Sequence, residues 1–495
     1  MSINLLRLGM KLAAVCVCGM VFCVGAASVN AQVGGVYVQT NDTERNEIAA
    51  FGRASDGRLY FIGNYATGGT GSTEFDGGEG LDPLISADSI ITTEDQRFLI
   101  TVNAGSDSIT SFQILSNFRL RRISTVSSGG VGPNSLAIRN NLVFVSNIDR
   151  DGFALGDPET PRGEPNDEGN ITAFRINRYG VLRPIAGSTI ELDNRPADLG
   201  ISADGSKLIV TSITAGSVVL PGENSENSVA VYDINPDGSN NGLVGAATST
   251  EVGNEEGRNL PSAIDFDTTV INGREFVVVT EAREFNSVGL PPTLPALQSG
   301  SVSVYELTQD GELDITASDI ALGDPDLGAF DPSVELTACW IDFARDGRTF
   351  FVSNAISASI SSFRLNDDGT TDLLEQEAAQ GTSGFANGDT TGPEVFGTTD
   401  GFIDLDVTDD GRFLYQLAGL DGSIYVYRVD GRGGLTFVQE ASGDLPEIDT
   451  QGLVTVSSQR AIQAIRFIDL LKSIFGRFKA FFIIKFYFPY FLGYF

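Results

Sequence analysis

The stretch Asp346-Gly347-Arg348-Thr349-Phe350-Phe351-Val352-Ser353-Asn354 contains the unit that decides the fold of this 495-residue chain. An aspartate-glycine turn leads into a hydrophobic strand that ends in Asn. After a loop, apolar and polar residues alternate over residues 359–363, which predicts a second strand. Another clear copy begins at Asp410-Gly411. Aligned on the strand end, the units fall at seven places: Asn41, Asn103, Asn147, Ser212, Glu281, Asn354 and Ala418.

No stretch with helical periodicity interrupts these units. A repeat of short strands cannot bury its faces alone, so the copies must stack on one another, and seven such sheets close into a ring. The sequence therefore predicts an all-β, seven-bladed β-propeller. The first unit, at residues 36–38, lacks a preceding inner strand, whereas residues 451–456 form a spare one. We therefore expect the ring to be closed by strands from both termini, which removes open sheet edges.

The composition limits the possible partners. The chain has no histidine and a net charge of −33, and residues 32–456 carry 24 basic and 64 acidic side chains, a net charge of −40. Such a surface repels nucleic acid and anionic membranes and favours cations. The absence of histidine removes the commonest neutral-pH general base and the commonest metal ligand.

The two ends of the chain differ from the repeats. A basic start, an apolar run and the small-residue site before Gln32 predict a signal peptide over residues 1–31, so that the protein is secreted or periplasmic. One cysteine, Cys339, then remains, and with Trp340 it is interpreted as a packing residue. Residues 457–495 carry six cations and one acid, Asp469. This basic aromatic tail has some amphipathic spacing, but its cations argue against stable membrane insertion. We interpret it as disordered or not native.

Long insertions fall in two classes of loop. They lie between second and third strands (148–170, 215–227, 282–299) and between blades (67–84, 322–337, 380–401). Both classes emerge on one face of a propeller, where binding sites are usually built. The stretches Asn235–Gly238 and Asn366–Gly369 resemble calcium loops, but they lack the ligand spacing and are interpreted as turns.

The repeats resemble the lactonase-type seven-bladed propellers, which include 6-phosphogluconolactonase and the 3-carboxymuconate-lactonizing enzyme. The residues that carry the resemblance are Val36-Tyr37-Val38-Gln39-Thr40-Asn41, Val102-Asn103-Ala104-Gly105-Ser106, Ser128-Gly129-Gly130-Val131-Gly132-Pro133 and Ala338-Cys339-Trp340. The resemblance covers residues 34–456 and implies a lactonase or a lactonizing cycloisomerase. The lactonizing enzymes are thought to use a histidine at the channel mouth with arginines and a glutamate. This chain has no histidine, so that mechanism cannot be carried over.

Acidic residues follow the predicted inner strands, which converge on the central channel. They are Asp88, Asp198, Asp265, Asp342, Asp404 and Asp406. Carboxylates brought together raise one another's pKa or bind a hard cation such as Ca²⁺. We choose Asp404, Asp198 and Asp88 as the candidate metal ligands. The alternative is that each aspartate bonds its own turn or pairs with an arginine.

Four further residues are candidates for a ligand site. Arg195, Arg258 and Arg283 lie at or beside loops of the predicted binding face, and arginines hold a carboxylate or phosphate through paired hydrogen bonds. Glu281 stands where other repeats have Asn and is the candidate base. The alternative is a solvated ion-pair network.

The predicted protein is a monomer that binds a small anionic ligand or a lactone at the channel mouth, and does not bind nucleic acid. It either hydrolyses or forms lactones, or it is a non-catalytic extracellular binding or scaffold module.

Overall fold

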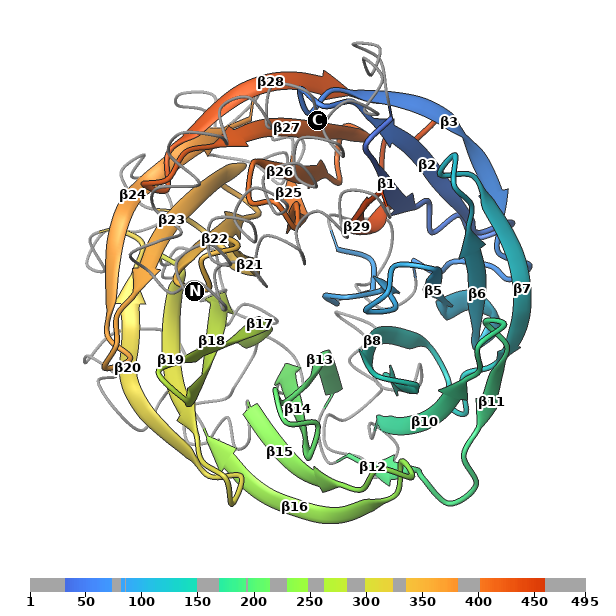
Figure 1. Ribbon diagram of the computed structural model, residues 1–495, viewed down its shortest axis with the longest axis horizontal. Coiled ribbons are helices and arrows are strands. Elements are labelled where there is room, and N and C mark those ends of the chain that lie inside the picture. Colours follow the sequence, from blue (N-terminus) through green and yellow to red (C-terminus); the bar gives the residue numbers. More distant parts are fainter. Residues whose placement is uncertain are drawn as a thin grey trace, which may run out of the picture.

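A computed structural model describes residues 32–73, 82–84, 86–148, 169–192, 195–213, 229–247, 262–282, 299–323, 335–381 and 401–458. Within these ranges 29 strands form seven antiparallel sheets arranged in a ring, which confirms the predicted seven-bladed propeller (Figure 1). The described residues contain one short 3-10 turn, Ala104–Ser106, and no helix long and apolar enough to cross a membrane.

The first three blades come from the N-terminal part and the extreme C-terminal strand. From the axis outward, blade 1 contains β29 (Gln451–Ser457), β1 (Gly34–Gln39), β2 (Glu47–Arg53) and β3 (Leu59–Ala66). Blade 2 contains β4 (Ile90–Thr92), β5 (Phe98–Asn103), β6 (Ser108–Ile114) and β7 (Leu120–Ser127). Blade 3 contains β8 (Pro133–Arg139), β9 (Leu142–Asn147), β10 (Asn170–Ile176), β11 (Leu182–Pro184) and the short β12 (Ile190–Glu191).

The remaining four blades follow in chain order. Blade 4 contains β13 (Arg195–Ile201), β14 (Lys207–Ile213), β15 (Val229–Ile234) and β16 (Asn240–Ala247). Blade 5 contains β17 (Ser262–Ile271), β18 (Arg274–Ala282), β19 (Ser301–Leu307) and β20 (Leu313–Ala321). Blade 6 contains β21 (Ala338–Phe343), β22 (Thr349–Asn354), β23 (Ser359–Leu365) and β24 (Thr371–Gln380). Blade 7 contains β25 (Phe402–Val407), β26 (Phe413–Ala418), β27 (Ser423–Val429) and β28 (Leu435–Ala441).

The ring closes in blade 1, as predicted. β29 pairs antiparallel with β1, and the register places Val456 opposite Gly35 and Leu453 opposite Val38. The C-terminal strand therefore supplies the inner strand of a blade whose other strands come from the N-terminus (Figure 1). Inner strands from all seven blades surround the central axis.

The blades pack through apolar side chains between neighbouring sheets. Within blade 6 the rings of Phe350 and Phe363 stack with their centroids 5.0 Å apart. Between blades 1 and 2, the hydroxyl of the fully buried Tyr37 donates to the Phe118 carbonyl. Successive side chains of a strand point to opposite faces of its sheet. Apolar residues occur on both faces, because a neighbouring blade covers each of them.

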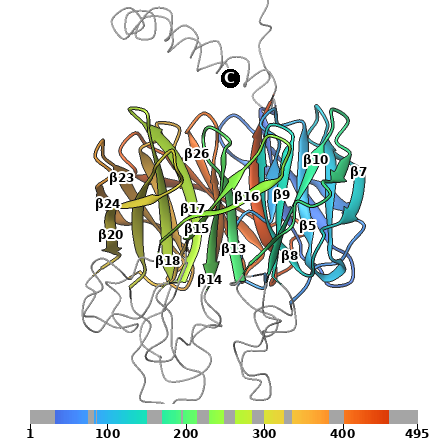
Figure 2. The same ribbon diagram turned by 90° about the horizontal axis from the view of Figure 1, so that it is seen from below.

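The antiparallel order gives the molecule two distinct faces, on which the strands begin and end (Figure 2). Loops between second and third strands and connections between blades leave from one face, which we call the long-loop face. The other, which we call the turn face, has tight turns such as Ala344 to Gly347 and Asn366 to Gly369. The turn interpretation of the sequences at 235–238 and 366–369 is confirmed, since Gly238 and Gly369 donate back to Asn235 and Asn366.

Candidate functional site

The inner strands bring the predicted aspartates together around the channel, and the structure adds Asp267. An upper row contains Asp198, Asp265 and Asp404, and Asp88 interacts with members of both rows. A lower row, nearer the turn face, contains Asp267, Asp342 and Asp406. Burial, together with the charges of Asp198 and Asp404, raises the pKa of Asp88. The three candidate metal ligands therefore share one channel.

Most of these carboxylates bond the next blade. Asp265 accepts the Ile341 N–H of blade 6 at 2.8 Å, and Asp404 accepts the Leu453 N–H of blade 1 at 2.6 Å. In the lower row Asp342 accepts the Val407 N–H at 2.6 Å. The same contact joins Asp267 to the Phe343 N–H and Asp406 to the Thr455 N–H.

This pattern has a simple cause. An inner strand pairs with its own sheet along one edge only, so the N–H groups on its other edge need acceptors. An aspartate from the preceding blade supplies one. In blade 3 a hydroxyl performs this role, because Ser135 Oγ accepts the Leu199 N–H at 3.1 Å while donating to Asp198 at 2.9 Å. These bonds correspond to neither the local turn bonding nor the arginine pairing that we considered from sequence.

The channel changes the ionisation of these groups. Burial raises the pKa of Asp404 to about 8 and of Asp198 to about 7. Burial also raises the pKa of Asp267 to about 6 and that of Asp406 to about 7.

Asp88 differs from the other six. It precedes β4, has a left-handed backbone with φ of 55°, and is exposed as a residue. Among the described residues, no hydrogen bond to this carboxyl is observed. No group of three His, Cys, Asp or Glu side chains in the described part of the chain is arranged to hold one metal ion. The Ca²⁺ prediction stays a prediction.

Glu281, the candidate base, lies near the end of β18 at the long-loop face and is 1% exposed. It accepts hydrogen bonds from Ser301 Oγ at 2.6 Å and Ser303 Oγ at 2.7 Å, both on the neighbouring strand. In blade 6 the amide of Asn354 makes the equivalent contacts with Ser359 and Ser361, and in blade 2 Asn103 does so with Ser108 and Thr110. Glu281 therefore occupies a repeated structural position with an acidic side chain.

The candidate arginines are only partly described. Arg195 is the first residue of β13, at the long-loop face, and is 5% exposed. It begins the inner strand of blade 4, next to the blade that contains Glu281. Arg258 and Arg283 lie outside the described residues.

Two buried charged residues were missed from sequence. Glu335, in the connection before β21, is 4% exposed, accepts a hydrogen bond from Ser359 Oγ, and has a pKa raised by burial. Arg53, at the end of β2, is 2% exposed and donates to Ser457 Oγ on the closing strand. Glu335 lies in a long connection and Arg53 at a strand end, and neither position carries a motif that marks it.

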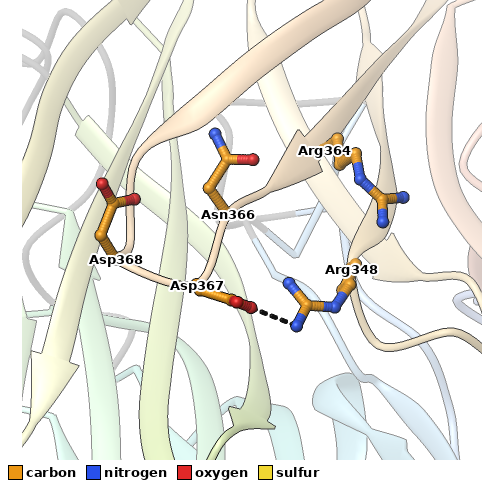
Figure 3. A pocket seen from close by; sticks show the side chains of 5 residues that line it. All are labelled: Arg348, Arg364, Asn366, Asp367 and Asp368. Atoms are coloured by element: carbon orange, nitrogen blue, oxygen red, sulfur yellow. Dashed lines mark hydrogen bonds and ion pairs between the residues drawn. The ribbon is translucent and has the colours of Figure 1, made fainter.

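The turn face has a shallow depression at blade 6, with a volume of about 610 Å³ (Figure 3). Its lining residues are Arg348, Arg364, Asn366, Asp367 and Asp368. Arg348 already pairs with Asp367, and Arg364 lies 3.5 Å from Asp346. These exposed ion pairs leave little unsatisfied charge for a ligand.

Comparison with solved structures supports the fold class. The chain resembles a putative 6-phosphogluconolactonase from Bacteroides fragilis, with a TM-score of 0.54 and 16% identity over 87% of this chain and 100% of the other. It resembles a Lactobacillus plantarum protein with a TM-score of 0.56 and 16% identity, over 86% and 100% of the two chains. It also resembles the Pseudomonas aeruginosa periplasmic gluconolactonase PpgL, with a TM-score of 0.51 and 17% identity, over 86% and 99%.

These similarities show the fold: the chain is a seven-bladed β-propeller with the architecture of the structures named above. The identities are too low to carry an activity. No family model matches the chain, and no curated protein matches it.

Proposed function

We propose that this protein is an extracytoplasmic lactonase-like propeller that binds a small organic acid or its lactone on the long-loop face. The observation that carries the proposal is the placement of buried Arg195 and buried Glu281 at this face, on neighbouring blades 4 and 5. A buried cation in a chain of net charge −33 is suited to hold an anionic ligand. Two of the similar structures, a putative 6-phosphogluconolactonase and a periplasmic gluconolactonase, support the same substrate class.

Without histidine, the side chains left for acid–base work are carboxylates, arginines and tyrosines, and we assign the role of base to the Glu281 carboxylate. In the proposed reaction Glu281 takes a proton from water as the water oxygen bonds to the lactone carbonyl carbon. The ring C–O bond then breaks, and the proton passes to the departing alkoxide. Arg195, with Arg258 and Arg283, holds the carboxylate or phosphate of the substrate. Lactone formation by cycloisomerisation would use the same base to remove or return a proton at carbon.

One observation favours a second candidate, a non-catalytic binding or scaffold module. The carboxylate of Glu281 is held by two serine hydroxyls in a position that Asn fills in blades 2 and 6. A structural role in blade 5 would explain these contacts without any reaction.

The two candidates are distinguished by assaying the purified protein against a panel of aldonolactones and phosphorylated aldonolactones with a pH indicator. Turnover that is lost in Glu281→Gln supports the enzyme. The matched control is Glu306→Gln on β19, whose carboxylate pairs with Arg274 at the other end of the same blade. Ligand binding by calorimetry without turnover of any lactone would favour the binding module.

The proposal also covers the export of the protein and its oligomeric state. We propose that residues 1–31 are removed during export and that the mature protein is a monomer. N-terminal sequencing of the exported protein tests the first point, and light scattering tests the second.

A further inference from the structure

The segment Ser86–Ser89, which we call the plug segment, precedes β4 of blade 2 and hydrogen-bonds to several other blades, including two that are not neighbours of blade 2. The Ser86 carbonyl accepts the Trp340 indole N–H of blade 6 at 3.2 Å. It also accepts the Gln451 side-chain amide of blade 1 at 3.1 Å. Both donors and Ser86 itself are buried.

Two more blades hold the same segment. The Ala87 N–H donates to the Ala197 carbonyl of blade 4 at 3.3 Å, and the Asp88 carbonyl accepts the Leu136 N–H of blade 3 at 3.1 Å. Blades 4 and 6 are not neighbours of blade 2 in the ring. Blades that are not adjacent can meet one segment only near the axis. The plug segment therefore crosses the channel.

Apolar packing also holds the plug segment in place at the axis. Ala87, 3% exposed, packs in a cluster with residues from the inner strands of other blades, and these residues are all buried. They are Ala197, Ile264, Trp340, Ile403 and Leu453. Trp340 stands where Asp404 stands in blade 7, so that an indole takes the place of a carboxyl in the upper row. A dry cluster of this kind leaves little room for water at this level.

The carboxylates differ in exposure along the axis. In the upper row Asp198, Asp265 and Asp404 are 1%, 6% and 7% exposed, whereas Asp267, Asp342 and Asp406 of the lower row are only half-buried. Asp88, within the plug segment, is an exposed residue and interacts with carboxylates of both rows. This order indicates that water enters from the turn face.

We propose that the plug segment closes the central channel at its long-loop end and divides the molecule into two compartments. On the long-loop face, the plug segment and Trp340 form a closed floor. Below them, the aspartates line a blind tunnel that opens only on the turn face. A solute bound on the long-loop face does not reach the aspartates. This division does not depend on the proposed lactone chemistry.

Hydrogen exchange tests the closure directly on the full chain. The peptide that covers residues 86–92 includes a connection, yet its amides should exchange as slowly as those of β25, at least about a hundredfold below the unfolded rate. The double variant Trp340→Phe/Gln451→Ala leaves the buried Ser86 carbonyl without these two donors. Exchange of that peptide should then rise about tenfold. The control Gln439→Ala removes a glutamine that bonds the Leu59 backbone on the outer side of the ring, and it should leave this peptide unchanged.

Fluorescence supplies a second readout that does not require the double variant to fold. Trp340 is the single tryptophan of the chain and is 1% exposed. Acrylamide should quench it several-fold less than in the urea-unfolded chain, and Gln451→Ala should increase quenching where Gln439→Ala does not. Exchange of residues 86–92 within seconds, or quenching of the native protein equal to that of the unfolded chain, would show an open channel and overturn the proposal. Equal effects of Gln451→Ala and Gln439→Ala would do the same.

Discussion

At the scale of single residues, Glu281 occupies a position that an asparagine fills in other blades, and it can have a structural or a catalytic role there. Its carboxylate accepts from Ser301 and Ser303, whereas Asn354 donates to Ser359 and Ser361 from the equivalent place. The geometry is shared, but the acid adds a negative charge that the amide lacks. Buried charged groups occur both at functional sites and in structural networks, so this position fits either of the two proposed roles.

If Glu281 is the base, Glu281→Gln should lower kcat about a hundredfold or more with little change in KM. Gln keeps an oxygen that the serine hydroxyls can bond, so the melting temperature should change little. Steady-state kinetics and thermal melting check both points. Full activity in Glu281→Gln would refute the assignment.

Arg195→Ala should act differently, because a binding residue contributes before the reaction begins. We expect weaker binding of an anionic substrate, seen as a KM raised about tenfold or more, since a charged hydrogen bond contributes about 1.5–3 kcal/mol. A neutral lactone should be affected less. Equal loss for anionic and neutral substrates would indicate a structural role for Arg195.

At the scale of elements, the seven-residue strand β29 contributes three separate sets of contacts that close the ring. It gives blade 1 an inner strand, its Leu453 and Thr455 N–H groups donate to the carboxylates of blade 7, and its Gln451 contacts the plug segment. Its loss would expose an edge of β1 and break the ring.

Deletion of residues 450–495 should therefore prevent stable folding, whereas deletion of 459–495 should leave the melting temperature within a few degrees of the full chain. Circular dichroism melts of the two truncations measure this difference. Similar melting of both would contradict a structural need for the closing strand.

The two rows of inner-strand carboxylates lead to a separate prediction for cations. If Asp88, Asp198 and Asp404 hold a divalent ion, calcium titration by calorimetry should show heat of binding that Asp404→Asn abolishes. The bonds of Asp404 to Leu453 and of Asp198 to Ser135 compete with this use. Absence of heat, together with no effect of the substitution, would leave these residues with their structural bonds alone.

At the scale of the whole molecule, the carboxylates make the ring sensitive to pH. Burial holds the pKa of Asp404 at about 8 and those of Asp198 and Asp406 at about 7, above the ordinary value of 3.8. The folded protein therefore binds these protons more tightly than the unfolded chain does. Their stabilising effect is complete below about pH 4 and is lost as the pH rises through 6 to 8.

We expect the melting temperature to fall between pH 5 and pH 8.5. Asp204 and Glu306, whose pKa values are lowered by hydrogen bonds, act with the opposite sign, but only near and below pH 4. Asp404→Asn keeps an acceptor for the Leu453 N–H and removes the charge. It should be more stable than the original protein at pH 8.5 by about 2–5 kcal/mol and similar at pH 5. A flat pH profile, or equal pH dependence in Asp404→Asn, would contradict this assignment.

The repeated units made the fold predictable. Period-2 alternation and Asp-Gly turns act within a few residues, so seven copies indicated seven sheets, and the missing strand before residue 36 indicated closure by β29. The candidate site was predicted in part. The convergence of Asp88, Asp198 and Asp404 follows from their place on inner strands, but their bonds to the next blade depend on how blades are rotated relative to one another.

The sequence by itself determined the class of fold, the number of blades, the identity of the closing strand and the acidic character of the channel. These properties follow from local periodicity and from composition. Only the tertiary structure decided that an edge N–H of one blade needs a carboxylate of another, that Glu281 shares the contacts of Asn354, and that Ser86–Ser89 cross the axis. Each of these depends on distances between residues far apart in the chain, such as Ser86 and Trp340 at 3.2 Å, which no local pattern encodes.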